Sequence, residues 1–213
     1  MKAEKTHLKG VLILTPKLIT DDRGFFQESY NQDTFKALGI NDIFIQDNHS
    51  LSKSQNIIRG LHFQFGDMAQ SKLVRVLKGS ILDVVVDIDP RSETFMQHLI
   101  IKLDDQLGQQ IYIPRGYAHG FRNLEAQTHV FYKVDNYYSV AHNTGIFWND
   151  KDLGIEWGCM HPELSDQDKN LPTFKEKMAE LERFELSNGF HHYTLSKRAH
   201  STALTQLQRK KQN

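Results

Sequence analysis

The chain has 213 residues, of which 39% are apolar and 24% are charged, an ordinary composition for a soluble globular protein. Its 26 lysines and arginines are balanced by 26 aspartates and glutamates, so net charge gives no reason to expect nucleic acid or a membrane surface as a partner. No apolar run approaches a transmembrane helix, no signal-peptide core follows Met1, and the single cysteine, Cys159, excludes an internal disulfide. We therefore expect a cytoplasmic protein.

Short apolar runs separated by turn residues fill the first 157 residues and predict about ten β-strands. These strands are expected at residues 11–14, 25–30, 43–46, 56–64, 72–77, 81–88, 98–103, 110–113, 118–123 and 128–134. Residues 31–38 are typical of a short helix ended by Gly39, and residues 47–50 of a polar loop. No helical crossover is long enough to join parallel strands, so the pattern predicts an all-β sandwich or barrel.

The composition changes after Trp157. Thr173 is a good N-cap, and apolar residues recur at helical spacing from there to about Leu186. We expect one domain over residues 1–186 and a polar, loosely ordered tail over residues 187–213.

The predicted strand at residues 81–88 shows a clear alternation. Leu82, Val84 and Val86 face one way, whereas Asp83 and Asp87 face the other. This pattern predicts an antiparallel strand that is buried on one face only.

Residues 56–64 form an apolar run with Arg59, Gly60 and His62 at its centre. A histidine in such a strand is usually a packed or hydrogen-bonded core residue, and by itself it does not indicate a function. Three later strands, however, each place one polar residue among apolar neighbours, where it could reach the same interior. These residues are Lys72, His119 and Tyr132.

A histidine, a lysine, a tyrosine and a second histidine supply a base, a cation, a weak acid and a hydrogen-bond donor. This set suits removal of a proton next to a carbonyl, because the base attacks the C–H bond while fixed positive charge stabilises the oxygen. A metal site is the alternative, but His62 is followed by Gln64, without the second histidine and acid that such a site needs. We therefore expect neither a metal nor another cofactor.

At these positions the chain resembles the dTDP-4-dehydrorhamnose 3,5-epimerases, cupin-fold enzymes of deoxysugar biosynthesis. The resemblance runs from about Val11 to Asp168. It is carried by the motifs at residues 22–29, 46–50, 59–64, 113–121, 136–139 and 148–150.

The resemblance implies a fold, an assembly and a reaction. The fold would be a metal-free cupin jelly roll with short, mainly C-terminal helices, and two chains would form a homodimer by sharing N-terminal strands. The reaction would be epimerisation at C3 and C5 of a dTDP-linked 4-keto-6-deoxyhexose. His62 would remove the protons, Asp168 would orient His62, Tyr132 would return a proton from the other face, and Lys72 would stabilise charge on the C4 oxygen.

The resemblance also implies a set of residues that hold the nucleotide, its phosphates or the sugar. They are Arg23, Phe26, Glu28, Gln46, Asn48, Arg59, His119 and Tyr138. Simple alternation would turn Arg59 and His62 to opposite faces of their strand, since they are three residues apart. Either Gly60 forms a β-bulge that re-aims one of them, or Arg59 serves only the mouth of the site.

Three positions depart from the family pattern. Asn143 and Gln167 stand where the family often has a glutamate and a lysine, and Gly158 stands where a proline is common. Epimerisation at C3 or C5 alone, a 3,4-ketoisomerase and a non-catalytic sugar-nucleotide binding protein therefore remain alternatives. Binding alone would need no base and acid, so the combination of these groups favours an enzyme.

Overall fold

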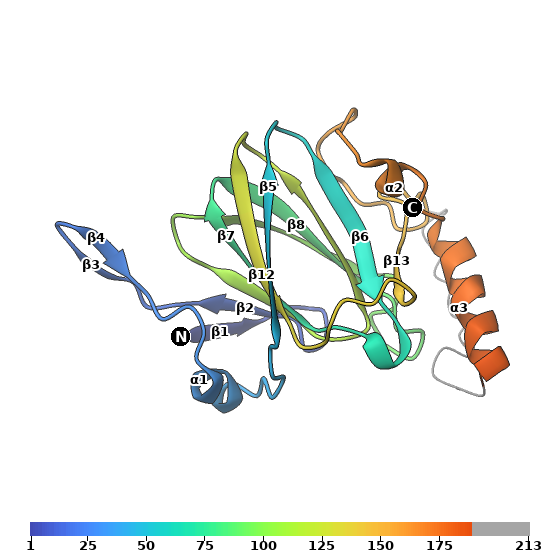
Figure 1. Cartoon of the computed structure of the whole chain (residues 1–213), viewed down its shortest axis with the longest axis horizontal. Coiled ribbons are helices and arrows are strands. Elements are labelled where there is room, and N and C mark those ends of the chain that lie inside the picture. The colour runs from blue at the N-terminus through green and yellow to red at the C-terminus, as the bar shows by residue number, and fades with distance from the viewer. Residues whose placement is uncertain (189–213) are drawn as a thin grey trace.

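Two antiparallel β-sheets face each other and enclose the interior of a jelly roll (Figure 1). The computed structural model describes residues 1–188, so the predicted tail lies outside the described residues except for positions 187 and 188. In spatial order, the six-stranded sheet contains β1 (Lys2–Lys5), β2 (Leu12–Thr15), β10 (Gln110–Ile113), β7 (Lys72–Lys78), β12 (Thr128–Val134) and β5 (Gln46–Ser52). The five-stranded sheet contains β13 (Asn143–Gly145), β6 (Ile58–Gln64), β11 (Tyr117–Asn123), β8 (Ser80–Asp87) and β9 (His98–Asp104). The predicted all-β fold is confirmed.

The space between the sheets is filled from both sides by β-branched and aromatic side chains. Val74 and Val130 come from the six-stranded sheet, and Ile81, Val85 and Phe121 from the five-stranded sheet. Because successive side chains of a strand alternate, one face of each strand supplies this core.

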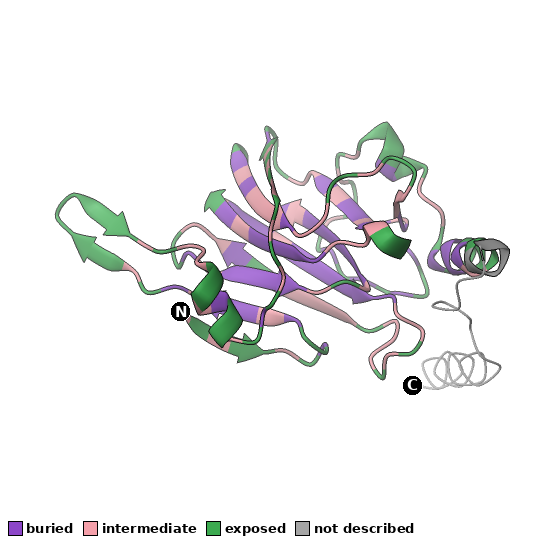
Figure 2. Cartoon of the chain, turned by 60° about the horizontal axis from the view of Figure 1, so that its bottom comes forward, coloured by how far each residue is buried: buried purple, intermediate pink, exposed green. Residues whose placement is uncertain are grey.

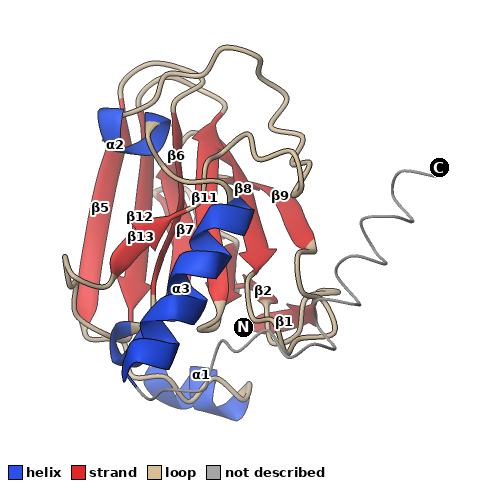
Figure 3. Cartoon of the chain, turned by 90° about the vertical axis from the view of Figure 1, so that its right-hand side faces the viewer, coloured by secondary structure: helices blue, strands red, loops and turns tan. Residues whose placement is uncertain are grey.

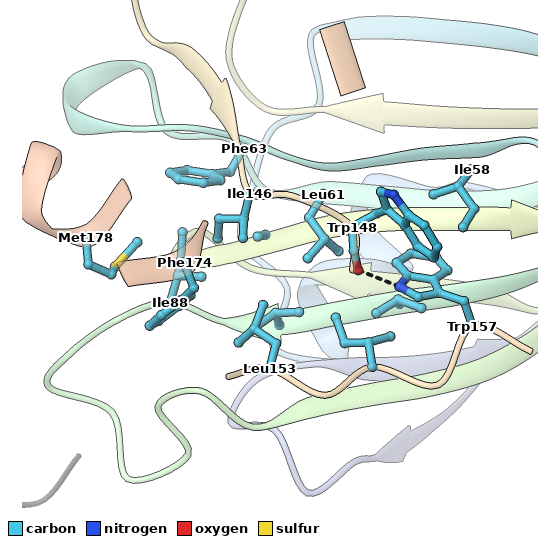
Figure 4. Packing of buried hydrophobic residues seen from close by; sticks show 14 of the residues in the cluster. Ile58, Leu61, Phe63, Ile88, Ile146, Trp148, Leu153, Trp157, Phe174 and Met178 are labelled. Carbon is cyan, nitrogen blue, oxygen red and sulfur yellow. Dashed lines mark hydrogen bonds between the residues drawn. The ribbon is translucent and has the colours of Figure 1, made fainter. Parts of the chain in front are cut away.

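The outer face of the five-stranded sheet is covered by the C-terminal part of the chain. Figure 3 shows α3 (Phe174–Asn188) lying across this face. Phe174 and Met178 of α3 pack in one cluster with Trp148 and Trp157, and the indole Nε1 of Trp157 donates to the carbonyl of Trp148 at 2.8 Å (Figure 4). The cluster also contains Val84 and Val86 of β8.

Because α3 and the segment before it cover this outer face, the expectation that residues 81–88 form a strand buried on one face only was wrong. Both faces of β8 are buried, and Asp83 and Asp87 are 0% and 1% exposed. The face that carries Asp83 also carries Ile81 and Val85, which belong to the core between the sheets. The alternation was read correctly, but the aspartates face the barrel interior instead of solvent.

The strand predicted at residues 43–46 and the loop predicted at residues 47–50 were also wrong. β5 begins at Gln46, runs through the supposed loop and pairs with β12 along its length. Its inward positions Asn48 and Ser50 line a polar cavity, so the apolar signal of a half-buried strand is missing. The sequence contains no clear signal for the short strands β1, β3 (Ile19–Asp21) and β13.

The hairpin of β3 (Ile19–Asp21) and β4 (Gly24–Phe26) projects away from the barrel, and we refer to residues 19–28 as the arm (Figures 1 and 2). Only the first part of the strand predicted at residues 25–30 forms. The side chains of Ile19, Phe25 and Phe26 are exposed. An isolated two-stranded hairpin is marginally stable in water, and exposed apolar side chains of this kind are typical of contact surfaces.

The helices begin where capping residues stand. Asn31 caps α1 (Gln32–Ala37) by accepting hydrogen bonds from two backbone amides of its first turn, and Gly39 follows with φ +85°. Thr173 and Glu176 bond reciprocally at the start of α3 as a capping box. Within residues 1–188, no helix is both long and apolar enough to cross a membrane.

Candidate active site

A cavity of about 440 Å³ opens between the two sheets. Nine of the twelve predicted site residues line it, and they come from both sheets, from the loop before β13 and from α2 (Asp166–Lys169). They are Gln46, Asn48, Arg59, His62, Lys72, His119, Tyr132, Tyr138 and Asp168. The convergence predicted from separate strands is therefore found in the structure.

A β-bulge turns both Arg59 and His62 toward this cavity. On β11, His119 pairs with His62 and Phe121 with Arg59, so two residues of β6 stand opposite the single residue Gly120. Gly60 has φ +118°, and a Cβ there would lie 2.6 Å from the Cα of Gly120. Only glycine fits this position, and the predicted bulge is confirmed.

His62 is held by the carboxylate of Asp168. The two side chains meet at 2.6 Å between Nε2 and Oδ1. An ionised carboxylate only accepts hydrogen bonds, so the Nε2–H of His62 donates and the lone pair of a neutral imidazole lies on Nδ1. This arrangement suits a general base.

Asp168 is fixed in turn by the short helix α2. The hydroxyl of Ser165, the N-cap of this helix, donates to Oδ2 of Asp168 at 2.8 Å and accepts from its backbone amide at 3.1 Å. Burial raises the pKa of Asp168, but the hydrogen bonds that its carboxylate accepts from His62, from Ser165 and from the amide of Gly60 hold the pKa below its usual value. The carboxylate therefore stays ionised at neutral pH.

Lys72 reaches across the barrel from the opposite sheet. It lies on β7 among valines, is 9% exposed, and donates from Nζ to the main-chain carbonyl of His62 at 3.1 Å. Burial lowers its pKa to about 8, and the charge of Asp83 opposes this shift. Lys72 is thus a buried cation next to His62.

Tyr132 lies on β12, with its backbone opposite Val74 of β7 on one side and Asn48 of β5 on the other. Burial raises the pKa of its hydroxyl, and the charge of Arg59 opposes the rise. The phenol therefore keeps its proton at neutral pH. His62 and Tyr132 come from the two opposing sheets, so they approach the cavity from different walls.

His119 forms a second histidine–aspartate pair, with Nε2 2.8 Å from Oδ2 of Asp83. His119 is 7% exposed and Asp83 is fully buried. Asp83 was missed because its strand seemed half exposed. An acid flanked on both sides by isoleucine, leucine and valine is the signal that could have found it, since a buried carboxylate needs a partner.

Arg23, Phe26 and Glu28 lie on the arm, and none of them lines the cavity of its own chain. The guanidinium of Arg23 bonds the neighbouring Asp21, and Phe26 is 67% exposed. Glu28 accepts hydrogen bonds from Asn31 and from the hydroxyl of Thr34.

The positions that depart from the family pattern lie in two different places. Asn143 and Gln167 both line the cavity. The wall therefore lacks the negative and the positive charge that a glutamate and a lysine would place there. Gly158 lies elsewhere, and its carbonyl accepts a hydrogen bond from Arg122. Its φ of +65° is incompatible with proline, which explains that departure.

The donor atoms of the cavity do not make a metal site. The Nε2 atoms of His62 and His119 each face their own aspartate, and no group of three histidine, cysteine or acidic side chains converges among residues 1–188. We therefore expect prolonged incubation with a chelator, followed by gel filtration, to leave turnover unchanged. Loss of turnover that one divalent ion restores would contradict this prediction.

Three comparisons with known proteins agree. The family model described as dTDP-4-dehydrorhamnose 3,5-epimerase matches residues 5–176. The dTDP-4-dehydrorhamnose 3,5-epimerase of Salmonella typhimurium is 48% identical over 176 residues, which cover 82% of this chain and 96% of that protein.

Solved structures give the same result. The dTDP-4-dehydrorhamnose 3,5-epimerase of Bacillus anthracis, crystallised with TDP and PPi bound, is 46% identical to this chain. The two structures match with a TM-score of 0.80, covering 81% of this chain and 98% of that one. The dTDP-6-deoxy-D-glucose-3,5-epimerase of Legionella pneumophila, in complex with dTDP-4-keto-L-rhamnose, is 37% identical, with a TM-score of 0.80 over 84% of this chain and 96% of that one.

Proposed function

The chain belongs to the dTDP-4-dehydrorhamnose 3,5-epimerase family, and from this membership we propose how its own residues carry out the reaction. It is an isomerase that inverts C3 and C5 of a nucleotide-linked 4-keto-6-deoxyhexose. We propose dTDP-4-dehydro-6-deoxy-D-glucose as the substrate and dTDP-4-dehydro-L-rhamnose as the product.

The 4-keto group acidifies the hydrogens on C3 and C5, because the charge left on carbon spreads onto the C4 oxygen. In our proposal, Nδ1 of His62 removes each proton while Asp168 keeps the imidazole in the required tautomer. Lys72 places its charge beside the enolate oxygen. One preorganised partner of this kind is typically worth about 3–4 kcal/mol.

Inversion requires a new proton on the face opposite the base. The observation that carries the proposal is that His62 and Tyr132 stand on opposing sheets, with the cavity between them. Tyr132 keeps its proton at neutral pH and is the proposed acid. His119, whose Nε2–H donates to Asp83, would accept a hydrogen bond from a sugar hydroxyl at Nδ1.

Proton NMR of the keto-sugar incubated with the enzyme in deuterated water tests this function. We expect deuterium at both C3 and C5 together with the L-rhamno product. Label and inversion at one carbon only would identify a single-site epimerase, the alternative that Asn143 and Gln167 leave open. A folded protein that binds the sugar without exchanging either proton would overturn the proposal in favour of a binding protein.

We also propose that the active form is a homodimer in which the arm of each chain completes the cavity of its partner. The apolar arm is exposed, and the three predicted ligand residues on it are remote from their own cavity. Arg23 would then bind phosphate together with Arg59, whose Nε is buried without a partner among the described residues. A cytoplasmic location and a place in dTDP-rhamnose biosynthesis belong to the same proposal.

Mixing two inactive variants tests the shared arm. His62→Asn lacks the base but keeps the arm, whereas Arg23→Ala with Glu28→Ala keeps the base but has a defective arm. If arms cross between chains, co-refolded mixtures should regain about a quarter of wild-type turnover, because half of random dimers are mixed and each holds one intact site. Turnover no higher than that of the separate variants would show that each arm serves its own chain.

A further inference from the structure

The segment that carries Tyr138 is held by three glutamine side chains. Gln70 donates to the carbonyl of Asn136 at 2.8 Å, and Gln46 accepts from the amide of Tyr138 at 3.1 Å. Gln64 makes two contacts, donating to the carbonyl of Tyr137 at 3.0 Å and accepting from the amide of Ser139 at 2.6 Å. Four backbone groups of residues 136–139 are thus satisfied by side-chain amides from outside the segment.

Gln64 is the most deeply placed of these three residues. It is 5% exposed, and its amide nitrogen also donates to the carbonyl of Met68 at 2.7 Å. Unlike Gln46 and Gln70, it does not line the cavity. It stands two residues after His62 on β6, so a single strand carries the proposed base and anchors the segment of Tyr138.

The side chain of Tyr138 needs such an anchor. It lines the cavity, yet the residue is 56% exposed, and the adjacent Tyr137 is 62% exposed. Little apolar burial therefore holds this part of the wall, and an unanchored loop would have to be ordered whenever ligand binds. Hydrogen bonds from a buried neutral amide remove that cost and do not depend on pH.

We propose that Gln64 is a positioning residue, which sets the affinity for the sugar nucleotide by holding Tyr138 over the cavity without touching the ligand. This inference rests on the proposed function, since it assigns Tyr138 to the substrate-binding wall. It assigns a task to a residue that was not among the predicted ligands.

Gln64→Met is the informative variant, because methionine has a similar length and volume but neither donates nor accepts comparable hydrogen bonds. The dissociation constant of dTDP-glucose, a stable probe without the 4-keto group, should rise about tenfold by calorimetry, since three backbone groups lose their partners. The KM for the keto-sugar should rise in parallel. Deuterium exchange at saturating substrate, which reports on His62, should change less than about threefold.

Gln55→Met is the control. Gln55 is also a glutamine whose side-chain amide donates to a main-chain carbonyl, that of Leu124 at 2.8 Å, and it belongs to neither the cavity nor the arm. Its replacement should leave the dissociation constant unchanged.

A double-mutant cycle separates positioning from general destabilisation. If Gln64 acts through Tyr138, the variant with both Gln64→Met and Tyr138→Ala should bind no more weakly than Tyr138→Ala alone. An unchanged dissociation constant in Gln64→Met, or independent losses in the double variant, would overturn the inference.

Two further measurements keep the result interpretable. If Gln64→Met does not fold, Gln64→Glu keeps the acceptor for Ser139 but sets a carboxylate against two carbonyl oxygens, and it should weaken binding at least as much. A folded Gln64→Glu variant with normal affinity would again overturn the inference. Wild-type protein that binds no dTDP-glucose would overturn the proposed function itself, and with it the role of Gln64.

Discussion

His62→Asn should abolish both epimerisation and the exchange of solvent deuterium into the keto-sugar. Asparagine has no lone pair basic enough to remove a carbon-bound proton. Of the other groups of the cavity, Tyr132 is a protonated phenol, and Lys72 and His119 are already bonded to the carbonyl of residue 62 and to Asp83. The variant should fold, because His62 is partly exposed and packs at the cavity wall. Proton NMR in deuterated water measures both losses in one sample.

Tyr132→Phe should lose epimerisation but keep the exchange of solvent deuterium into the substrate. The ring keeps its packing beside Val74, but the acid is gone, so epimerisation should fall roughly 10²–10⁴-fold. His62 can still remove the proton and return one to the same face. Recovered starting material should therefore contain deuterium, provided that the imidazole exchanges its proton with water before returning it.

The controls for both variants are a histidine and a tyrosine of the six-stranded sheet. His129→Asn replaces a histidine of β12 that bonds His49, and Tyr112→Phe replaces a buried tyrosine that bonds Asp42. Neither residue lines the cavity, so turnover should be unchanged in both. Normal epimerisation by Tyr132→Phe, or undiminished exchange in His62→Asn, would refute the assignment of acid and base.

Lys72→Met should fold and bind but turn over at least about a hundredfold more slowly, as expected for the loss of one fixed partner of an oxyanion. Methionine suits the apolar neighbours of this position and removes a buried charge. Thermal unfolding at neutral pH should accordingly occur at a higher temperature than in the wild type. Lys133→Met, which removes a lysine paired with Asp47 outside the cavity, is the control and should keep full turnover.

The pH dependence follows from the pKa of Lys72, about 8 in the folded protein against an ordinary value of 10.5. The amine is charged below pH 8 and loses its charge above it, so kcat/KM should fall as pH rises through about 8. Between pH 8 and 10.5 the unfolded chain binds the extra proton, so wild-type stability should rise relative to Lys72→Met across this window. A flat alkaline profile, or near-normal turnover by folded Lys72→Met, would show that the charge is not used.

Local chemistry predicted some features of the structure well. The bulge at Gly60 followed from the need to bring Arg59 and His62 to one side, the end of α1 followed from Gly39, and the cap of α3 followed from Thr173. These features depend on residues that are close in sequence, where steric rules and hydrogen-bonding capacity decide the outcome.

The errors arose where a distant segment decides which face is buried. Alternation in β8 identified its two faces, but it could not reveal that α3 and the segment before it cover the outer one. In β5 the polar cavity removed the apolar signal on which strand prediction relies.

The position of Asp168 also constrains when a newly synthesised chain becomes competent. The strands that carry His62, Lys72 and Tyr132 are all complete by Val134, whereas Asp168 follows more than thirty residues later and is placed by α2, just before α3 docks on the outer face. Consider a chain that is still attached to the ribosome and of which only the strands up to Val134 have emerged. Such a chain contains the proposed base, acid and lysine, but it lacks the carboxylate that orients the base. Without that carboxylate the tautomer of His62 is not fixed, so we expect a chain truncated before α2 to remove protons from the keto-sugar much more slowly than the full-length protein.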